Sequence, residues 1–598
     1  MFAEVLVRRR TRVETLTYAI PAAIIPYIRV GSQVVVSVGR QIVKGVVLKI
    51  TRVVPRELRS KLKDIQNVDK NALGFSFLQI ATIEKLADYY GASLSEIAYH
   101  ALSFPSPLAA EKAKPSPQKP LFVQAPWPDR LKFYQRIIKK HAGKKRLVFL
   151  FAVESFAAEF AKTVGSSANV FFDDLNAAQT KNLNALIATQ KPVIIIGGQK
   201  WAFFPLQAGD VIVIDQPDHV GLTSQRRPYM SAKQIGLARA ATEGVQLVLG
   251  ADAPSVADYL HQQNSSWQFL RQKLPARELV IFDKTRSADL LLPNFVAELR
   301  QAAEKKEKVL VFAASRGWAS ALYCRECSQV QDCPNCGRPI GLKNERELIC
   351  LYCGFTGARP VFCSNGHEKL VSLGEGVAQI TAVVKKILPT AAVAEVSGEI
   401  INLPVAQILV TTEKILSFPS GTDVLSEALK GEVERPPAQY NSLFIAAADQ
   451  LLAGSSQDGS WHLLSILLAL RSRVKNIYIQ TRFPDHWVWL AVGTGKLDEF
   501  YQRELEERKK YRLPPFGQEL KLVGRDKNLE RLQKQADEIA EKLEKEFPSA
   551  TFSAAQPRRI PGQQFELTLQ LYRATHFSPA EKHSLRAIFP PSWAIVLD

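Results

Sequence analysis

The chain has 598 residues, more than one average domain of about 100 to 200 residues, and this length predicts roughly three to five domains. Hydrophobic residues make up 46% and charged residues 23%, as in ordinary globular proteins, which excludes wholesale disorder. The 77 Lys and Arg residues outnumber the 58 Asp and Glu residues, and the net charge of +19 favours a polyanionic partner such as nucleic acid.

The sequence carries no signal for a membrane segment. No apolar run reaches the roughly 18 residues that a membrane-spanning helix needs, and four arginines follow the opening segment MFAEVLV almost at once. All seven cysteines fall between Cys324 and Cys363, whereas a disulfide framework would spread pairs along a secreted chain. We therefore expect a cytoplasmic protein without a membrane partner, whose cysteines bind metal in a reducing compartment.

The first 105 residues are expected to form a small β-rich domain. Strand-like segments are VLVRRRT, ETLTYAI, QVVVSVG and IVKGVVLKI, and helical spacing follows from Leu78 to Tyr90. Residues 106–120 combine Pro, Ala, Lys and Ser without an apolar period, which predicts a semi-extended linker.

Two α/β lobes are expected after this linker. Over residues 121–275, buried-strand runs such as LVFLF, VIVID and LVLG alternate with helix-length stretches, which favours a parallel sheet with crossover helices. A second series, over residues 283–499, contains VLVFAAS, ILVTT and NIYIQT and is interrupted by the cysteine cluster at 323–370. Residues 500–598 predict a small α+β domain, with a helical stripe from Leu529 to Leu543 and an alternating strand from Phe565 to Leu571.

Six of the cysteines form pairs with the spacing of zinc knuckles. The pairs are Cys324 with Cys327, Cys333 with Cys336, and Cys350 with Cys353. Six thiolates exceed one tetrahedral site and Cys363 adds a seventh, so two zinc ions are expected with one ligand missing, for which His367 is the nearest candidate. A polar, turn-rich segment has too little apolar surface to fold around unliganded cysteines, and a mostly thiolate ligand set predicts a structural metal.

The order of these parts resembles the PriA family of primosomal proteins, which recognise stalled replication forks and help to reload the replicative helicase. The resemblance is carried by the TYAIP segment from Thr17, the cysteine cluster with LGEGVAQI after it, and the PPFG segment from Pro514. It runs from Val5 to the strand after Gly562 and implies two tandem RecA-like lobes with a zinc-binding insert in the second. It further implies an N-terminal β-rich DNA-binding domain and a small α+β C-terminal domain. The family's usual winged-helix domain is missing, and the linker stands in its place.

The resemblance also assigns the metal ligands. In the family the pairs interleave, so one ion would be held by Cys333, Cys336, Cys350 and Cys353, and the other by Cys324, Cys327 and Cys363. The eighth family cysteine falls on Gly366 in this sequence. The second site is thereby either weakened or completed by His367 or water.

A DNA-binding pocket in the N-terminal domain is implied in the same way. The family binds the 3′ end of a nascent strand there, and the matching residues are Thr17, Tyr18, Gly39, Arg40 and Lys63. A glycine turn lets backbone approach the terminal sugar, and a lysine offers a point charge to phosphate. For Tyr18 alone, a core aromatic is the more frequent interpretation.

The phosphate-binding loop of a helicase motor is missing. Such a loop supplies glycine-rich backbone amides, a Lys for the phosphates and a Ser or Thr for Mg²⁺. At the family's position the chain reads LFVQAPWPDRLKFY, with Trp127 and Pro128 in the expected turn, Arg130 in place of the Lys and Leu131 in place of the hydroxyl. A bulky ring and prolines remove both space and donors.

Two further nucleotide motifs have changed. The family's Asp-Glu-Glu-His motif holds Mg²⁺ and activates water. Here it reads Asp-Gln-Pro-Asp from Asp215, and Gln216 cannot accept a proton as Glu would. The arginine motif reads ILLALRSR, with Ile466 and Leu470 at the former glutamine and first arginine and only Arg473 retained. These losses predict no productive use of ATP and Mg²⁺.

Clusters of basic residues could contact DNA phosphates. They are Arg8, Arg9, Arg10, Lys139, Lys140, Lys144, Lys145 and Arg146. Each alone is more often part of a solvated face, but the net positive charge predicts that DNA affinity falls steeply with salt.

The sequence thus predicts a zinc-containing, helicase-like DNA-binding protein that acts in replication restart at forks or branched DNA with a 3′ end, without helicase or ATPase activity. One alternative is an active ATP-dependent 3′ to 5′ DNA helicase with a divergent nucleotide site. Another is a zinc-stabilised binder of RNA or of other proteins. The resemblance implies single-strand DNA-binding protein and other primosome proteins as partners.

Overall fold

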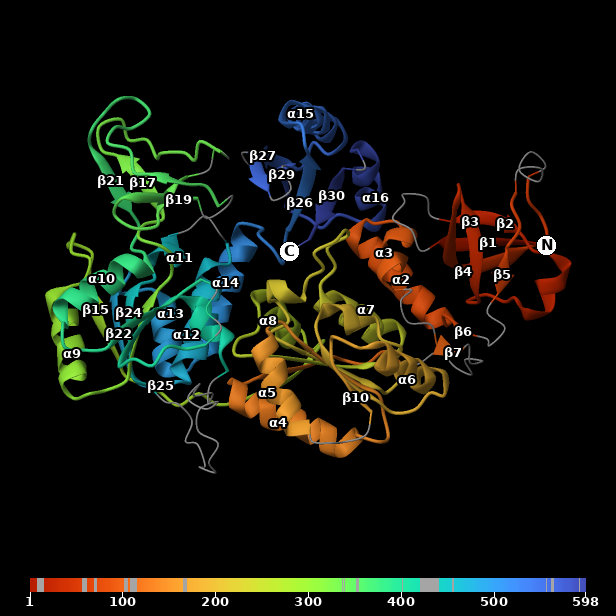
Figure 1. The fold of residues 1–598 in the computed structure, drawn as a ribbon, viewed down its shortest axis with the longest axis horizontal. Coiled ribbons are helices and arrows are strands. Elements are labelled where there is room, and N and C mark those ends of the chain that lie inside the picture. Colours follow the sequence, from red (N-terminus) through yellow and green to blue (C-terminus); the bar gives the residue numbers. More distant parts are fainter. Residues whose placement is uncertain are drawn as a thin grey trace.

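The protein was analysed as a computed structural model that describes most of the chain. The described residues are 1–7, 15–55, 62–68, 73–101, 106–107, 116–164, 169–335, 337, 339–350, 354–398, 400, 402–419, 440–453, 457–554, 557–560, 564–590 and 592–597. Figure 1 shows an N-terminal sheet at one end, two α/β lobes side by side, a cysteine-rich insert above the second lobe and a C-terminal sheet above the first. The expected α/β class with parallel sheets is confirmed.

The N-terminal part contains a five-stranded antiparallel sheet with the order β2-β1-β4-β3-β5. Its elements are β1 Phe2–Val7, β2 Leu16–Ala19, η1 Ala22–Tyr27, β3 Gln33–Val38, β4 Gln41–Thr51 and β5 Asn67–Val68. The turn from β3 to β4 contains Gly39 at a φ of +62°, a conformation that glycine adopts at low cost. Each predicted strand is therefore present where its residues are described.

Two helices connect this sheet to the first lobe. The predicted helix after Leu78 is α2 Phe77–Tyr90, which begins with a reciprocal capping box between Ser76 and Gln79 and ends at Gly91. The other elements here are α3 Leu94–Ala101 and the paired strands β6 Leu73–Gly74 and β7 Ser106–Pro107. The start of the expected linker thus pairs as a short strand, and residues 108–115 lie outside the described residues.

The first lobe is a seven-stranded parallel sheet with the order β10-β11-β9-β12-β13-β8-β14. Its strands are β8 Leu121–Gln124, β9 Leu147–Phe151, β10 Val170–Phe171, β11 Ile194–Gly197, β12 Val211–Asp215, β13 Gln246–Ala251 and β14 Gln268–Arg271. Its helices are α4 Trp127–His141, α5 Glu154–Val164, α6 Ala177–Ala188, η2 Gln199–Phe203, η3 Val220–Leu222, α7 Ala232–Thr242 and α8 Val256–Gln263. Helices cover both faces, so every residue of β9 and β12 is buried, as their continuous apolar runs predict.

The second lobe is a six-stranded parallel sheet with the order β15-β25-β24-β16-β23-β22. Its strands are β15 Leu279–Asp283, β16 Val309–Ala313, β22 Val393–Val396, β23 Ile408–Thr411, β24 Tyr440–Ala447 and β25 Val474–Thr481. Its helices are α9 Pro293–Glu304, α10 Val377–Ile387, η4 Glu413–Ser417, α11 Asp449–Ala453, α12 Gly459–Arg471, α13 Trp487–Thr494 and α14 Leu497–Lys510.

The cysteine-rich insert leaves the second lobe after β16 and returns before α10. Its strands are β17 Ala321–Cys324, β18 Gly341–Leu342, β19 Glu347–Ile349, β20 Thr356–Ala358 and β21 Leu370–Leu373. β17 pairs with β21, so the two ends of the insert meet at its base. The described part of the insert has a small apolar core around Leu322 and Leu342.

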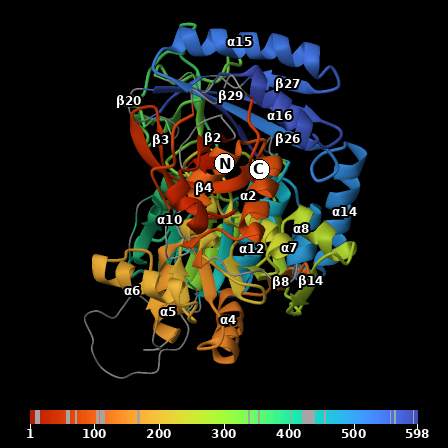
Figure 2. The same cartoon turned by 90° about the vertical axis from the view of Figure 1, so that its right-hand side faces the viewer.

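The C-terminal part packs two helices on an antiparallel sheet (Figure 2). Its elements are β26 Gln518–Asp526, α15 Leu529–Glu546, β27 Thr551–Ala554, β28 Arg558–Ile560, β29 Gln564–Arg573, α16 Pro579–Ile588 and β30 Trp593–Val596. The predicted stripe of α15 is buried against Leu520 and Leu569 of the sheet, which confirms that it serves this domain's own core. Among the described helices, none is both long and apolar enough to cross a bilayer.

The two lobes are joined by a continuous apolar core. Ala253, Val256 and Tyr259 of the first lobe belong to the same buried cluster as the apolar side of α12. Trp461 Nε1 and Tyr501 OH both donate to the carbonyl oxygen of Pro254, each at 2.7 Å. The rings of Tyr259 and Tyr501 stack with centroids 4.3 Å apart. Lobe contact is therefore built from packing as well as from hydrogen bonds.

Candidate functional site

Three segments of the N-terminal domain converge on the turn between β3 and β4. Lys63 Nζ donates to the carbonyl oxygen of Gly39 at 2.9 Å. The backbone of Ala19, at the end of β2, exchanges hydrogen bonds with the segment 63–65 at 3.0 Å in each direction. Residues far apart in the sequence are thus held beside one turn. Of the expected DNA-contacting residues, Gly39 and Lys63 take part in these hydrogen bonds, and Tyr18 and Arg40 are direct sequence neighbours of residues that do.

The residues of this group differ in accessibility. Gly39, Arg40 and Lys63 are exposed and Thr17 is half-buried, so DNA could reach all four. Tyr18 is only 3% exposed, its OH donates to the Ser37 carbonyl oxygen at 3.0 Å, and burial raises its pKa. The ring of Tyr18 therefore supports the turn from the core, while the accessible atoms are a backbone turn and two cationic side chains.

The first lobe has no room for a phosphate-binding loop at the expected position. β8 ends at Gln124 and α4 begins at Trp127, so only Ala125 and Pro126 connect them. A glycine-rich phosphate loop needs a longer connection whose amides point inward. Trp127 and Pro128 therefore lie in the first turn of α4 and not in a loop before it, which corrects the sequence-based expectation for these two residues.

The Trp127 ring is part of the lobe's core. It is 3% exposed, meets the Phe156 ring edge to face at 4.7 Å, and donates from Nε1 to Glu159 Oε2 at 2.9 Å. A buried aromatic in this arrangement holds the start of α4 against α5.

Arg130 occupies the place of the missing phosphate-binding lysine and is completely buried. Its Nε donates to Asp215 Oδ1 at 2.8 Å, and its NH1 donates to Asp252 Oδ2 at 2.8 Å and to the Ala125 carbonyl oxygen at 2.6 Å. Tyr134 OH, one turn further along α4, donates to Asp215 Oδ1 at 2.7 Å. We call Arg130, Tyr134, Asp215 and Asp252 the arginine–aspartate cluster.

The charges of this cluster compensate one another. Burial alone would lower the pKa of Arg130, but Asp215 and Asp252 raise it above its usual value. Burial raises the pKa of Asp215 and Arg130 counteracts this shift. The Asp215 carboxylate, which the resemblance assigns to Mg²⁺, thus already has a permanent cation and a phenol as partners.

Packing leaves little space around the cluster. A Cβ atom added to Gly250 would lie 1.9 Å from the Tyr134 OH, so this position on β13 has room only for hydrogen. The neighbouring Gln216 has a φ of +51°, and its backbone N–H donates to the Gly250 carbonyl oxygen at 2.7 Å. The side chains that replaced the nucleotide motifs are therefore fitted to one another.

Arg473 is held apart from solvent in the second lobe. It is 7% exposed, and its NH1 donates to the Ile415 carbonyl oxygen at 3.0 Å. Burial lowers its pKa, which Asp252 counteracts from the first lobe. Ile466 and Leu470 are buried as core residues of α12. A cavity of about 210 Å³ remains between the lobes, and Gln216, Asp252 and Ile466 contribute to its lining.

Asp252 and Tyr134 are the members of the cluster that sequence reasoning missed. Asp252 lies within the segment GADAPS from Gly250 to Ser255, and Tyr134 lies four residues after Arg130 on α4. Acidic partners for Arg130 could have been expected from the sequence, because an Arg that follows an apolar strand needs them if it is buried.

Among the described residues of the basic clusters, Arg146 is the one that is buried. It is 4% exposed, and its guanidinium donates to backbone carbonyl oxygens, including those of Pro205 and Ile187. It therefore holds the lobe together and cannot reach phosphate, which corrects the expectation for this residue. The arginines Arg8, Arg9 and Arg10 lie outside the described residues.

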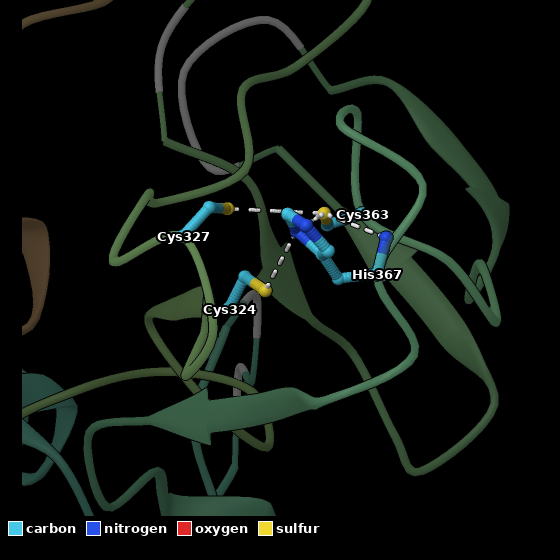
Figure 3. A group of neighbouring side chains, drawn as sticks. All are labelled: Cys324, Cys327, Cys363 and His367. Carbon is cyan, nitrogen blue, oxygen red and sulfur yellow. Dashed lines mark hydrogen bonds between the residues drawn. The ribbon is translucent and has the colours of Figure 1, made fainter.

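Four side chains of the insert gather around one point (Figure 3). They are Cys324, Cys327, Cys363 and His367, whose ligand atoms all lie within 4.8 Å of one another. Cys327 Sγ lies 3.9 Å from Cys363 Sγ, and His367 Nδ1 lies 3.4 Å from Cys363 Sγ and 3.9 Å from Cys324 Sγ. Ligands at normal zinc distances in a tetrahedron lie about 3.5 to 3.8 Å apart, so this group fits one Zn²⁺.

The backbone around the group suits thiolates. The N–H groups of Asn365 and His367 both point at Cys363 Sγ at 3.3 Å. The backbone N–H of Cys327 is the main cause that lowers the pKa of Cys324 to about 7. Gly366, where the family has a cysteine, has a φ of +81°, and a Cβ atom added there would meet no other atom within 4 Å. The next residue, His367, supplies an imidazole instead.

The other expected ligand set is described only in half. Cys333 and Cys350 are buried at 2% and 1% exposure in the core of the insert. Cys336 and Cys353 lie outside the described residues. The zinc site formed by Cys333, Cys336, Cys350 and Cys353 therefore stays a prediction.

Comparison with known proteins agrees with the N-terminal geometry. A family model described as the 3′ DNA-binding domain of PriA matches residues 4–103. This range contains β2, the turn at Gly39 and Lys63. The domain that carries the exposed turn therefore resembles a module that binds DNA 3′ ends.

Curated relatives extend the similarity along the chain. Replication restart protein PriA of Borreliella burgdorferi is 24% identical over 373 residues, which cover 59% of this chain and 55% of that protein. The protein of the same name from Helicobacter pylori is 22% identical over 484 residues, covering 78% of this chain and 76% of that protein. The match thus spans little more than half of the Borreliella protein.

Solved structures give a weaker similarity. Dbp5 of S. cerevisiae bound to RNA and ADP BeF3 has a TM-score of 0.33 and 10% identity, covering 65% of this chain and 89% of that one. A similarity at this level does not define the fold. The family-model match over residues 4–103 and the curated relatives show that the chain is similar to PriA proteins.

Proposed function

We propose that this PriA-like protein binds forked or branched DNA with a 3′ end in replication restart, and that it does so without helicase or ATPase activity. The observation that carries the absence of ATP chemistry is the arginine–aspartate cluster, which occupies the position of the phosphate loop and engages both carboxylates next to it. DNA binding is supported by the match to a 3′ DNA-binding domain and by the net charge of +19.

Nucleotide binding would have to displace Arg130. The two-residue connection before α4 offers no set of inward amides for a triphosphate, and Mg²⁺ would compete with a guanidinium for Asp215. Separating a buried ion pair costs about 3 to 5 kcal/mol. Gln216 lacks the carboxylate that would orient an attacking water. These features together support a lobe pair that serves as a scaffold.

Zinc completes the proposed composition. Cys324, Cys327 and Cys363 with His367 would hold one Zn²⁺, and Cys333, Cys336, Cys350 and Cys353 would hold a second. A closed set of four ligands contributes folding energy and leaves no position for substrate, so the metal would order the insert. By resemblance the insert and lobes would meet single-strand DNA-binding protein and other primosome proteins in the cytoplasm.

The alternative function is that of an ATP-dependent 3′ to 5′ DNA helicase. It is favoured by the cavity of about 210 Å³ that remains between the lobes. The third interpretation, a zinc-stabilised binder of RNA or of other proteins, would be indifferent to a DNA 3′ end.

Binding to matched forks tests the proposal. We expect the purified chain to bind a fork with a free 3′ hydroxyl at the branch more tightly than the same fork with a 3′ phosphate, and equally well with or without ATP. Equal affinity for both forks, or preference for an RNA of the same sequence, would overturn the DNA 3′-end assignment. Strand separation that requires ATP would establish the helicase instead.

A further inference from the structure

One face of the first lobe carries exposed positive charge that lies outside both the turn at Gly39 and the cysteine-rich insert. The helix α4 turns Trp127, Arg130 and Tyr134 into the lobe. Its outer side and the turn after it expose basic residues, namely Lys132, Arg136, Lys139, Lys140 and Lys144. We call these five residues the α4 basic face.

The charge of this face is largely uncompensated. Asp129 is the only acidic residue between Trp127 and Val153, and its carboxylate meets Lys132 Nζ at 3.6 Å. Among the described residues, neither Lys139 nor Lys140 nor Lys144 has an ion pair within 4.0 Å. Partial burial lowers the pKa of the His141 imidazole, and the charges of Lys145, Lys140 and Lys144 lower it further.

Stabilisation of helix α4 explains only some of the basic residues of this face. Cations near a helix C-terminus gain about 0.3 to 1 kcal/mol from the helix dipole, which covers Lys139 and Lys140. Arg136 lies a turn earlier, and Lys144 follows Gly143 in the turn beyond the helix. Exposed like charges this close together repel one another, so their grouping fits contact with an anionic surface.

The chemistry of the face favours the phosphates of duplex DNA. Single-stranded nucleic acid is held by aromatic side chains on which unpaired bases stack. On α4 the ring of Trp127 is buried, that of Tyr134 is buried and that of Phe133 is half-buried, so the exposed side offers no such platform. It also offers no exposed large apolar residue that could enter a lipid surface. Charge without stacking is the pattern of sequence-independent backbone contact.

We propose that the α4 basic face binds the phosphate backbone of a duplex arm of the DNA whose 3′ end the N-terminal domain engages. This inference rests on the DNA binding proposed above. The helix α4, which carries this face, lies at the lower side of the first lobe, away from the N-terminal sheet in both views (Figures 1 and 2). A duplex arm must therefore extend along the lobe to meet it, and a short arm cannot.

Forks that differ only in arm length test this inference. A chain of this size has a radius of gyration of about 25 Å, so a duplex arm of about 30 base pairs, roughly 100 Å, can span it, whereas a hairpin arm of about 6 base pairs cannot. The variant carries Lys139→Ala, Lys140→Ala and Lys144→Ala. A matched control removes three exposed lysines from α15 by Lys534→Ala, Lys542→Ala and Lys545→Ala.

Affinity is measured at several salt concentrations by anisotropy. Each lost phosphate contact reduces the slope of log affinity against log salt by about 0.9, so the α4 variant should lose about 2.7 on the long arm and nothing on the short arm. The α15 control should match the parent. Unchanged slopes, or equal losses in both variants, would overturn the inference while leaving 3′-end selectivity intact. An equal slope loss on a single-stranded arm of the same charge would overturn the assignment to duplex. Failure of the parent to bind either fork would instead refute the proposed function.

Discussion

Arg130 is the residue that most strongly supports the proposed absence of ATP chemistry. A lysine in a phosphate loop is a free point charge for a ligand, whereas the guanidinium of Arg130 distributes its donors over Asp215, Asp252 and the Ala125 carbonyl oxygen. A positive charge is thus present at this position, but protein groups occupy its hydrogen-bond donors and leave them unavailable to a triphosphate.

Replacing Arg130 should destabilise the first lobe. Arg130→Met would leave the Asp215 and Asp252 carboxylates without their cation, and breaking a buried pair in this way costs about 3 to 5 kcal/mol. Hydrogen exchange of the β8 and β12 amides reports the opening free energy of this sheet. The control is Lys132→Met on the same helix, whose side chain is 67% exposed and whose loss should change stability by less than about 0.5 kcal/mol. A loss below about 1 kcal/mol for Arg130→Met would contradict the role of the cluster.

For single residues, the sequence indicated which motif residues are replaced more readily than it indicated which side chains the replacements contact. Arg130 and Gln216 were recognisable as departures from a nucleotide site, because motif positions are local in the sequence. The hydrogen bond from Arg130 to Asp252 joins residues 122 positions apart, and no spacing rule indicates it. For Tyr18 the more frequent interpretation, a core aromatic, is confirmed, since its ring is buried although its neighbours in the motif are accessible.

At the scale of elements, the turn between β3 and β4 should decide recognition of the 3′ end. Lys63→Ala removes the exposed ammonium beside Gly39, and we expect affinity for forks with a free 3′ end to fall about tenfold, or about 1.4 kcal/mol. Lys49→Ala, also exposed on this domain, is the control and should bind as the parent does. If Lys49→Ala weakens binding as much as Lys63→Ala, the overall positive charge of the domain, and not the turn at Gly39, explains the affinity. Both can be measured by anisotropy at one salt concentration.

The metal-binding element yields a prediction about composition. His367→Ala removes the imidazole that lies 3.4 Å from Cys363 Sγ, so the zinc content should fall from two ions per chain to one. His367→Cys restores a thiolate at the same place and should keep both ions. His576→Ala, an exposed histidine outside the insert, is the control. Zinc is counted by elemental analysis of dialysed protein. Retention of two tightly held ions by His367→Ala would show that His367 is not a ligand.

Elements with strong periodicity were predictable from the sequence. The apolar runs of β9 and β12 and the stripe of α15 each imply a buried face, and the structure places them so. The two-residue connection between β8 and α4 was not, because Trp127 and Pro128 fit a turn as well as the first turn of a helix. In the metal group, knuckle spacing indicated the cysteines and closeness to Cys363 in the sequence indicated His367, and the structure brings His367 Nδ1 to 3.9 Å from Cys324 Sγ.

At the scale of the whole molecule, the lobes form a connected body. The apolar cluster that includes Tyr259 and α12 crosses from one lobe to the other, and Arg271 in the first lobe pairs with Asp498 of α14 at 2.7 Å. A motor must open and close this interface in each cycle of hydrolysis. An interface held by packing, next to the arginine–aspartate cluster, suits the proposed scaffold, whose parts would keep their arrangement while DNA is bound.

The most direct test is ATP turnover by the purified chain with and without forked DNA. The account predicts that phosphate release stays at the level of an Asp215→Asn preparation, which carries the same contaminants, and that adding forks does not raise it. A rate that increases with fork concentration in the parent, and is absent in Asp215→Asn, would contradict the central claim that Arg130 and its carboxylates have replaced the nucleotide.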